Sequence, residues 1–261
     1  MPCCVSALAP KPARLARVLL SLLAAVPLAS LDARELLAVG TTFGRVFERN
    51  AAGEFVGLGV DLVRVMAERT GDTVRFELYP WVRAQTLVER GAADILVGPY
   101  KTPERELRFA FAERAFYQDQ MVFYVRAGTA LGWDGNYARL KGQPVAAILG
   151  WAYGASFDRA RDSMELTNTA KLENGIQMLM RQHVSFLATN RRNTEALLAA
   201  MDLVGAITPI EPVIDVQNGY IAFPKNAEYE ALRSDFNRVF NAMVASGDFA
   251  RLARKHQVTI P

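Results

Sequence analysis

The feature that most constrains the fold is an alternation of short strand-like runs with helical runs, which begins at Glu35. In residues 74–79 apolar and polar side chains alternate, as in a half-buried strand, whereas apolar residues of 60–69 recur at helical spacing before Gly71. Such an alternation is typical of α/β domains with mostly parallel sheets. The pattern predicts strands at 35–39, 74–79, 94–97, 120–125, 145–149, 184–188 and 219–223, and helices at 60–69, 84–90, from about 154, at 173–181 and at 228–245.

The same order of elements starts again after the strand predicted at 120–125. The chain then returns to a strand at 219–223 and to a long amphipathic helix at 228–245, which Gly247 ends. No low-complexity linker separates the two units, so ordered strands, not a flexible tether, should join them. The sequence therefore predicts two nested α/β units.

The first thirty-three residues have the pattern of a secretory signal. Lys11, Arg14 and Arg17 precede the apolar run 18–29, and small and polar residues follow it. The run is shorter than the ~20 residues that a membrane-spanning helix needs, which makes a retained anchor the weaker alternative. We predict a signal peptide at 1–33, with cleavage after residue 33 or residue 29. No cysteine follows the run to carry a lipid, so the exported protein should be free in the periplasm.

Charge and residue counts exclude several kinds of site. Removal of residues 1–33 lowers the formal net charge from +3 to +1, which gives no electrostatic case for a nucleic-acid partner. Both cysteines, Cys3 and Cys4, lie in the predicted signal, so the exported chain has no thiol. With only His183 and His256, and no glycine-rich phosphate loop, we predict no metal site, no cofactor and no catalytic residue. Binding is favoured over catalysis.

Two segments of the first unit resemble signatures of a known family. Residues 49–62 (RNAAGEFVGLGVDL) and 101–105 (KTPER) resemble the bacterial extracellular solute-binding proteins of the amino-acid type, family 3. Further similar segments occur in the expected order at 140–142, 150–154, 220–225 and 247–249. The resemblance covers essentially the whole chain after the predicted signal.

The resemblance implies a periplasmic binding protein fold of type II, with two nested α/β lobes joined by two crossing strands. Lobe one would comprise residues 34–121 and 220–261, and lobe two residues 122–219. In this family the lobes close by a hinge motion on a small-molecule solute, and the closed form docks transiently on the membrane permease of an ABC transporter. We expect a monomer.

The turn from Thr102 to Arg105 is the first candidate ligand site. Threonine at an N-cap and Pro103 at the first helical position predict a helix start, and the free N–H groups of such a start attract anions. Arg105 can hold a carboxylate with two parallel hydrogen bonds. The resemblance places the family's clamp arginine here, and a surface arginine at a capped turn is the alternative.

Aromatic residues of the first unit are further candidates. The resemblance places Phe43 and Trp81 as walls that sandwich the ligand, and Tyr100 directly precedes the clamp turn. Simple core packing is the alternative for each of them.

In the second unit the candidates follow the strand predicted at 145–149. Trp151, Tyr153 and Gly154 should lie at its carboxyl end, where open α/β sheets bind ligands. The backbone N–H of Gly154 would begin a helix and could face an anion. Packing of Trp151 inside the lobe is the alternative.

The chain also departs from the family pattern. Members that bind α-amino acids carry an aspartate for the ligand's ammonium where this chain has Asn190, and an acidic residue before the first helix is replaced by Gly59. An amide cannot neutralise a cation. Four arginines could make the cleft electropositive, which points away from polyamines and basic amino acids: Arg45, Arg83, Arg105 and Arg191.

We therefore predict a receptor that captures a small polar or anionic solute, amino-acid-like or a carboxylate, for an ABC importer, with no enzymatic activity. Two alternatives stay open. One is a periplasmic dehydratase or lyase on the same fold, for which Glu48 is a weak candidate acid. The other is a sensing module that presents its ligand state to a membrane partner.

Overall fold

The computed structural model describes residues 1–4, 34–129 and 132–261. The apolar run and the cleavage site of the predicted signal peptide lie outside the described residues. Ala33–Pro261 form one compact unit, and only that unit is described below. Within the described ranges, no helix is long and apolar enough to cross a membrane.

One large sheet runs through this unit in the strand order β4-β1-β5-β11-β7-β10-β8-β9. In lobe one, β1 (Glu35–Gly40) pairs in parallel with β4 (Thr73–Leu78) and β5 (Ile95–Tyr100). In lobe two, β8 (Pro144–Ile148) pairs in parallel with β9 (Glu165–Thr169) and β10 (Phe186–Asn190). Short strands complete lobe one: β2 (Glu48–Arg49), β3 (Phe55–Val56) and β6 (Phe109–Phe111).

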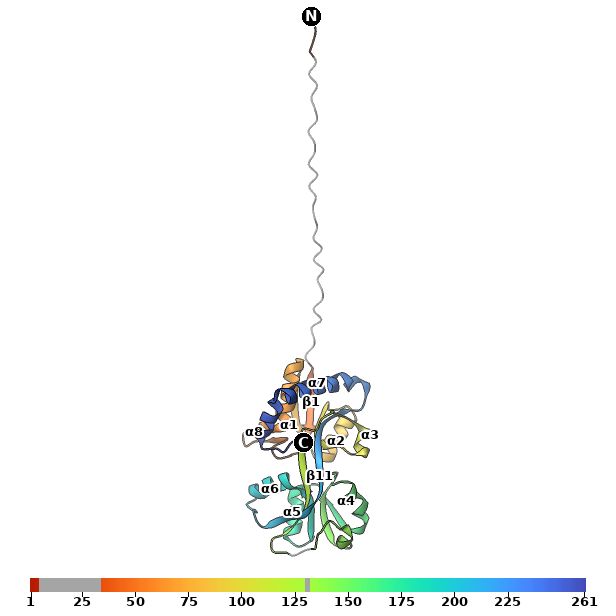
Figure 1. Cartoon of the computed structure of the whole chain (residues 1–261), viewed down its shortest axis with the longest axis vertical. Helices are drawn as coiled ribbons and strands as arrows, with labels where there is room; N and C mark the ends of the chain where they lie inside the picture. The colour runs from red at the N-terminus through yellow and green to blue at the C-terminus, as the bar shows by residue number, and fades with distance from the viewer. Residues whose placement is uncertain (5–33, 130–131) are drawn as a thin grey trace. The chain divides into compact units, whose positions relative to one another are not determined.

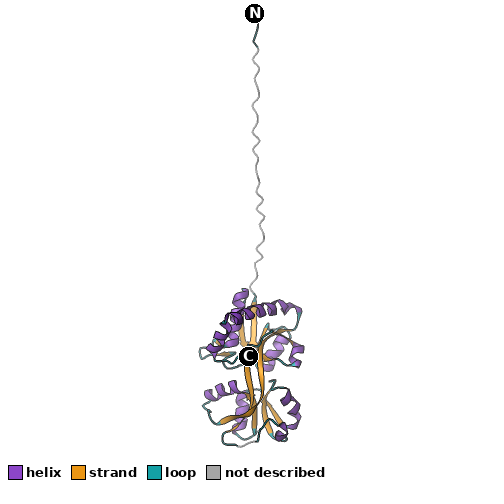
Figure 2. Ribbon diagram, viewed as in Figure 1, coloured by secondary structure: helices purple, strands orange, loops and turns teal. Residues whose placement is uncertain are grey.

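Two long antiparallel strands cross between the lobes, as Figures 1 and 2 show: β7 (Tyr117–Arg126) and β11 (Ile207–Pro224). The first part of β11 pairs with the end of β7, and its last part pairs with β5. On its other edge β7 pairs with β10. The predicted α/β fold with two crossing strands is confirmed, while the exact lobe limits at residues 121 and 219 stay predictions.

Helices cover both lobes (Figure 2). Lobe one carries α1 (Leu58–Thr70), α2 (Trp81–Glu89), α3 (Pro103–Arg108), α7 (Glu230–Ser246) and α8 (Asp248–His256). Lobe two carries α4 (Ala155–Ala160), α5 (Leu172–Met180) and α6 (Arg191–Ala200). Short 3₁₀ turns lie at Tyr137–Leu140, Arg161–Ser163 and Ala227–Tyr229.

The sheet of lobe two is buried on both faces. On β10, Phe186 and Ala188 join one hydrophobic cluster, whereas Leu187 joins a second cluster with Ile176 of α5 and Leu198 of α6. Because successive side chains of a strand point to opposite faces, this division shows that a helical layer covers each face.

The ends of several helices were predicted correctly from single residues next to them. Gly71 and Gly247 end α1 and α7 with φ of 78° and 79°, left-handed values that glycine adopts without strain. The helix predicted at 84–90 begins earlier, at Trp81, because Pro80 takes the N-cap position, where a missing N–H costs no helical bond. The strand predicted at 219–223 is only the end of β11.

Candidate functional site

A small cavity lies between the two lobes, at the carboxyl end of β5. Its lining comes from lobe one and from the segment after β8 in lobe two: Phe43, Trp81, Gly98, Tyr100, Arg105, Trp151 and Ala152. The space open to the centre of a water molecule is about 10 Å³, which is room for one water at most. The lobes are therefore closed on each other.

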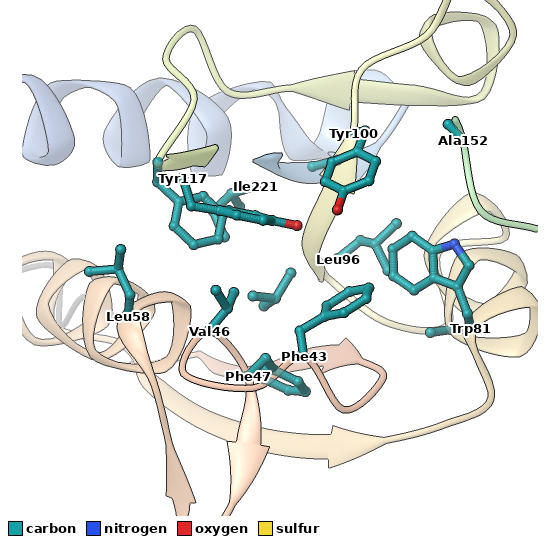
Figure 3. Packing of buried hydrophobic residues seen from close by; sticks show 14 of the residues in the cluster. Phe43, Val46, Phe47, Leu58, Trp81, Leu96, Tyr100, Tyr117, Ala152 and Ile221 are labelled. Carbon is teal, nitrogen blue, oxygen red and sulfur yellow. The ribbon is translucent and has the colours of Figure 1, made fainter. Parts of the chain in front are cut away.

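Aromatic rings form most of the cavity wall. The Phe43 ring lies 5.3 Å from Trp81 and 6.1 Å from Trp151, measured between ring centroids. Figure 3 shows Phe43 and Trp81 facing each other below Tyr100, with the indole nitrogen of Trp81 turned toward the segment that carries Ala152. That nitrogen donates a hydrogen bond to the carbonyl of Gly150 at 3.0 Å, which links α2 of lobe one to lobe two.

Arg105 is the one charged residue in the lining of this cavity. The hydroxyl of Thr102 accepts a hydrogen bond from its backbone N–H at 3.2 Å, so the predicted N-cap of α3 is confirmed. The Arg105 side chain turns inward, and the residue is only 5% exposed. Its Nη1 donates to the carbonyl of Tyr100 and its Nη2 to the carbonyl of Gly150, each at 2.8 Å.

The guanidinium of Arg105 is buried without a counter-ion, since no carboxylate of the described residues pairs with it. Removal from water lowers the pKa of Arg105 to about 10, and the group stays charged at neutral pH. Two neutral carbonyls satisfy part of its hydrogen-bonding capacity but none of its charge. The cavity wall therefore carries a buried positive charge that no charged group of the described residues balances.

A second polar group lies behind Tyr100 and was not predicted. Arg192 of α6 holds Asp119 of β7 with two parallel hydrogen bonds, from Nε to Oδ1 at 2.8 Å and from Nη2 to Oδ2 at 2.7 Å. The hydroxyl of Tyr100 donates to Asp119 Oδ2 at 2.7 Å. Burial opposes the charge on Arg192, but Asp119 outweighs that effect and raises the pKa of the guanidinium. The pair is a closed neutral unit.

The same helix holds lobe one directly. The side-chain oxygen of Asn193 accepts from the backbone N–H of Gly44 at 2.8 Å, and Arg192 Nη1 donates to the carbonyl of Gly44. Gly44 lies in the loop after β1, so both bonds cross from lobe two to lobe one. With the two bonds to Gly150, they hold the cleft shut.

Not all the predicted ligand residues line the cavity. Phe43, Trp81, Tyr100, Arg105 and Trp151 do. Thr102 and Asn190 serve as N-caps of α3 and α6 instead.

Two predicted residues of lobe two lie elsewhere. Tyr153 is fully buried, accepts a hydrogen bond from the backbone N–H of Ile148 at 2.7 Å and packs on Phe157 at 4.6 Å. Gly154 begins α4, but the carboxylate of Asp215 closely approaches it. Neither residue lines the cavity, although Ala152, directly before them, does.

The expected group of four cleft arginines is reduced to one. Arg45 donates to the carbonyl of Gln257, Arg83 packs over the ring of Tyr79, and Arg191 pairs with Glu211. None of these three lines the cavity. The sequence could not show this, because charge alone does not reveal which way an arginine side chain points.

Two other features carry no site. Glu48, the weak candidate acid, accepts from the backbone N–H of Arg45 at 2.7 Å and lies outside the lining. A shallow hollow of about 390 Å³ between α8 and the C-terminal segment has Arg254 as its single charged lining residue, and that residue is exposed.

Comparisons with known proteins agree with this architecture. The sequence profile described as bacterial extracellular solute-binding proteins, family 3, matches residues 39–259. No curated protein sequence matches the chain.

Solved structures with the same fold are numerous. A histidine kinase sensor domain with similarity to periplasmic binding proteins has 17% identity and a TM-score of 0.79, over 88% of this chain and 99% of that one. A mutant of ArgBP from T. maritima has 20% identity and a TM-score of 0.73, over 85% and 94%. A histidine-bound substrate-binding protein of a Streptococcus pneumoniae ABC uptake transporter has 17% identity and a TM-score of 0.71, over 85% and 91%. At these identities the likeness concerns the fold alone.

Proposed function

The chain belongs to the bacterial extracellular solute-binding proteins of family 3, and from this premise we propose that it captures a small anionic or polar solute between its lobes and delivers it to an ABC importer. The observation that carries the proposal is the buried Arg105. Its guanidinium lies among aromatic walls, between the two lobes, with no carboxylate partner among the described residues. A solute carboxylate would supply the missing negative charge and could accept two parallel hydrogen bonds from the guanidinium.

The contacts of the closed structure indicate how binding would proceed. Separation of the lobes breaks the bonds of Trp81 and Arg105 to Gly150, while the bond of Arg105 to Tyr100 stays within lobe one. Nη2 of Arg105 then faces solvent and can take a carboxylate. Closure over the solute would bury the new ion pair, and the solute favours the closed form only by binding it more tightly than the open form.

The remaining expectations belong to the same proposal. We propose that residues 1–33 direct export to the periplasm, and that the exported chain acts there as a monomer without metal or cofactor. Lobe one would span residues 34–121 and 220–261, and lobe two residues 122–219. The partner of the closed form would be a membrane permease.

A second candidate function is ligand sensing through a membrane partner. It is supported by the likeness to a histidine kinase sensor domain along almost the whole of that domain. It is also supported by the cross-lobe bonds of Arg192 and Asn193, which hold a closed form by contacts within the protein.

Ligand-induced stabilisation tests the receptor function. A solute at 100 times its dissociation constant raises the free energy of unfolding by ~2.7 kcal/mol, which a thermal-shift screen of carboxylates, amino acids, sugars and polyamines detects. Arg105→Ala should abolish the shift. Arg83→Ala is the matched control, because Arg83 is exposed on α2 and does not line the cavity. An undiminished shift in Arg105→Ala contradicts the proposal.

Uptake separates the importer from the sensor. Deletion of the gene should stop uptake of the identified solute by intact cells if the protein feeds a permease. Unchanged uptake with a lost transcriptional response to the solute would favour the sensor.

A further inference from the structure

Resting on the proposed function, we infer that the solute is a monocarboxylate with an apolar body and no positive charge, such as an aromatic or branched-chain 2-oxo acid, and not an α-amino acid. An α-amino acid needs an anchor for its carboxylate and an acceptor for its ammonium. The described site offers the first, but its lining has no carboxylate to balance the charge of the second.

The charge of the cavity lining is +1, because Arg105 is its single ionised residue. The buried carboxylate next to the lining is Asp119, and both its oxygens are already engaged. Oδ1 accepts from Arg192 Nε, and Oδ2 accepts from Arg192 Nη2 and from the hydroxyl of Tyr100. An ammonium could take Asp119 only by leaving Arg192 without its counter-ion.

Asn190 offers no acceptor either. Its side-chain oxygen caps α6 by accepting from the backbone N–H of Asn193 at 2.8 Å, and this bond fixes which side of the amide is oxygen. Its NH₂ group therefore points the other way and donates to the hydroxyl of Tyr100 at 3.3 Å. Toward the cavity wall, Asn190 presents a donor, which repels an ammonium.

The rest of the site favours an apolar body. Phe43, Trp81 and Trp151 surround the cavity. An aromatic ring of the solute can replace one of their mutual contacts at ~4.5–7 Å between ring centroids, and a branched chain can pack on the same rings. Val82, which lies next to Gly150, and Leu149, which precedes Gly150, are 46% and 49% exposed. A second carboxylate on the solute would lie among these apolar groups without a cation, so dicarboxylates are disfavoured as well.

Matched pairs of probes test the inference by isothermal titration calorimetry of the purified protein. Phenylpyruvate is compared with phenylalanine, and 4-methyl-2-oxopentanoate with leucine, since each pair shares its carboxylate and apolar body and differs at the α-ammonium. Glutarate and arginine complete the set. We expect each oxo acid to bind at least about tenfold more tightly than its amino acid, and Arg105→Ala to remove this binding while Arg83→Ala keeps it.

The nearly isosteric Asn190→Asp provides an independent test. Aspartate still caps α6, but it adds a carboxylate beside Tyr100, so the preference for the oxo acid should fall by about tenfold or reverse. Circular dichroism checks that the variant folds.

The outcomes separate this inference from the proposed function. If an amino acid binds as tightly as its oxo acid, or if glutarate or arginine binds best, the inference is overturned and solute binding stands. If neither these probes nor the sugars and polyamines of the wider screen bind, both are overturned.

Discussion

Removal of one member of the Arg192–Asp119 pair should destabilise the protein far more than removal of both. The pair is almost completely buried, with side-chain exposures of 11% and 1%. The guanidinium of Arg192 lies over the ring of Tyr117 at 5.2 Å. In Arg192→Met the shorter apolar chain can still pack on this ring, but Asp119 is left as a buried charge. Breaking a buried pair in this way costs about 3–5 kcal/mol, a large part of the ~5–15 kcal/mol that a domain has in total.

A double-mutant cycle isolates this effect. Asp119→Asn should cost a similar amount, because it leaves the guanidinium unpaired, whereas the double variant leaves no buried charge and should recover about 2 kcal/mol or more of the summed loss. Urea unfolding followed by circular dichroism gives each free energy. Losses below about 1 kcal/mol that add without coupling would refute the reasoning, since solvent-exposed pairs behave in that way.

Three further predictions follow from single contacts. Asn193→Ala removes the acceptor of the Gly44 N–H and should shift the ligand-free protein toward an open form. Small-angle X-ray scattering would then give a larger radius of gyration. An unchanged radius would show that this bond does not hold the lobes together. Thr102→Ala removes the N-cap of α3, so it should lower the free energy of unfolding by ~1 kcal/mol and weaken anion binding through Arg105; unaltered affinity in calorimetry would contradict the positioning role. Burial raises the pKa of the Asp61 carboxyl, but hydrogen bonds with Lys and His side chains of α8 outweigh it, and the folded pKa is below the usual value. This stabilisation is present above ~pH 4 and is lost as the pH falls through the folded pKa. Asp61→Asn should therefore cost ~1 kcal/mol at pH 7 and progressively less as the pH falls below ~4 in urea titrations, and a pH-independent difference would contradict the assignment.

The sequence predicted those parts of the fold that depend on near neighbours. The N-cap at Thr102 and the glycine stops at Gly71 and Gly247 are set by residues within one turn. The first twelve residues of β11 were missed because residues 207–218 carry two prolines and two acidic residues and show no sustained alternation. Its strand character comes from pairing with β7, about ninety residues earlier.

The residues of the candidate site were also predicted only in part. Phe43, Trp81 and Arg105 were expected from the family resemblance. Tyr100 was expected from its place before the clamp turn, and Trp151 from the end of a predicted strand. The structure brings all five to one cavity. The group formed by Asp119, Arg192 and Asn193 could not be predicted. Seventy-three residues separate Asp119 from Arg192, each is an ordinary surface-type residue in its own segment, and only the pairing of β7 with β10 brings them together.

The hydrogen bonds of the closed structure also limit how much free energy any solute can gain by binding between the lobes. The cross-lobe donors already have acceptors, so a solute gains only the difference between its own bonds and those that it replaces. These donors belong to Trp81, Arg105, Gly44, Asn190 and Arg192. For a neutral acceptor at Arg105 that difference is close to zero, since Gly150 offers a carbonyl at 2.8 Å. For a carboxylate it is the gain from a neutral to a charge-assisted, two-bond contact in a site shielded from water. Under the proposed function, selection for an anion would follow from the bonds that the site already makes, because a solute shifts the balance between open and closed forms only by its differential affinity for them.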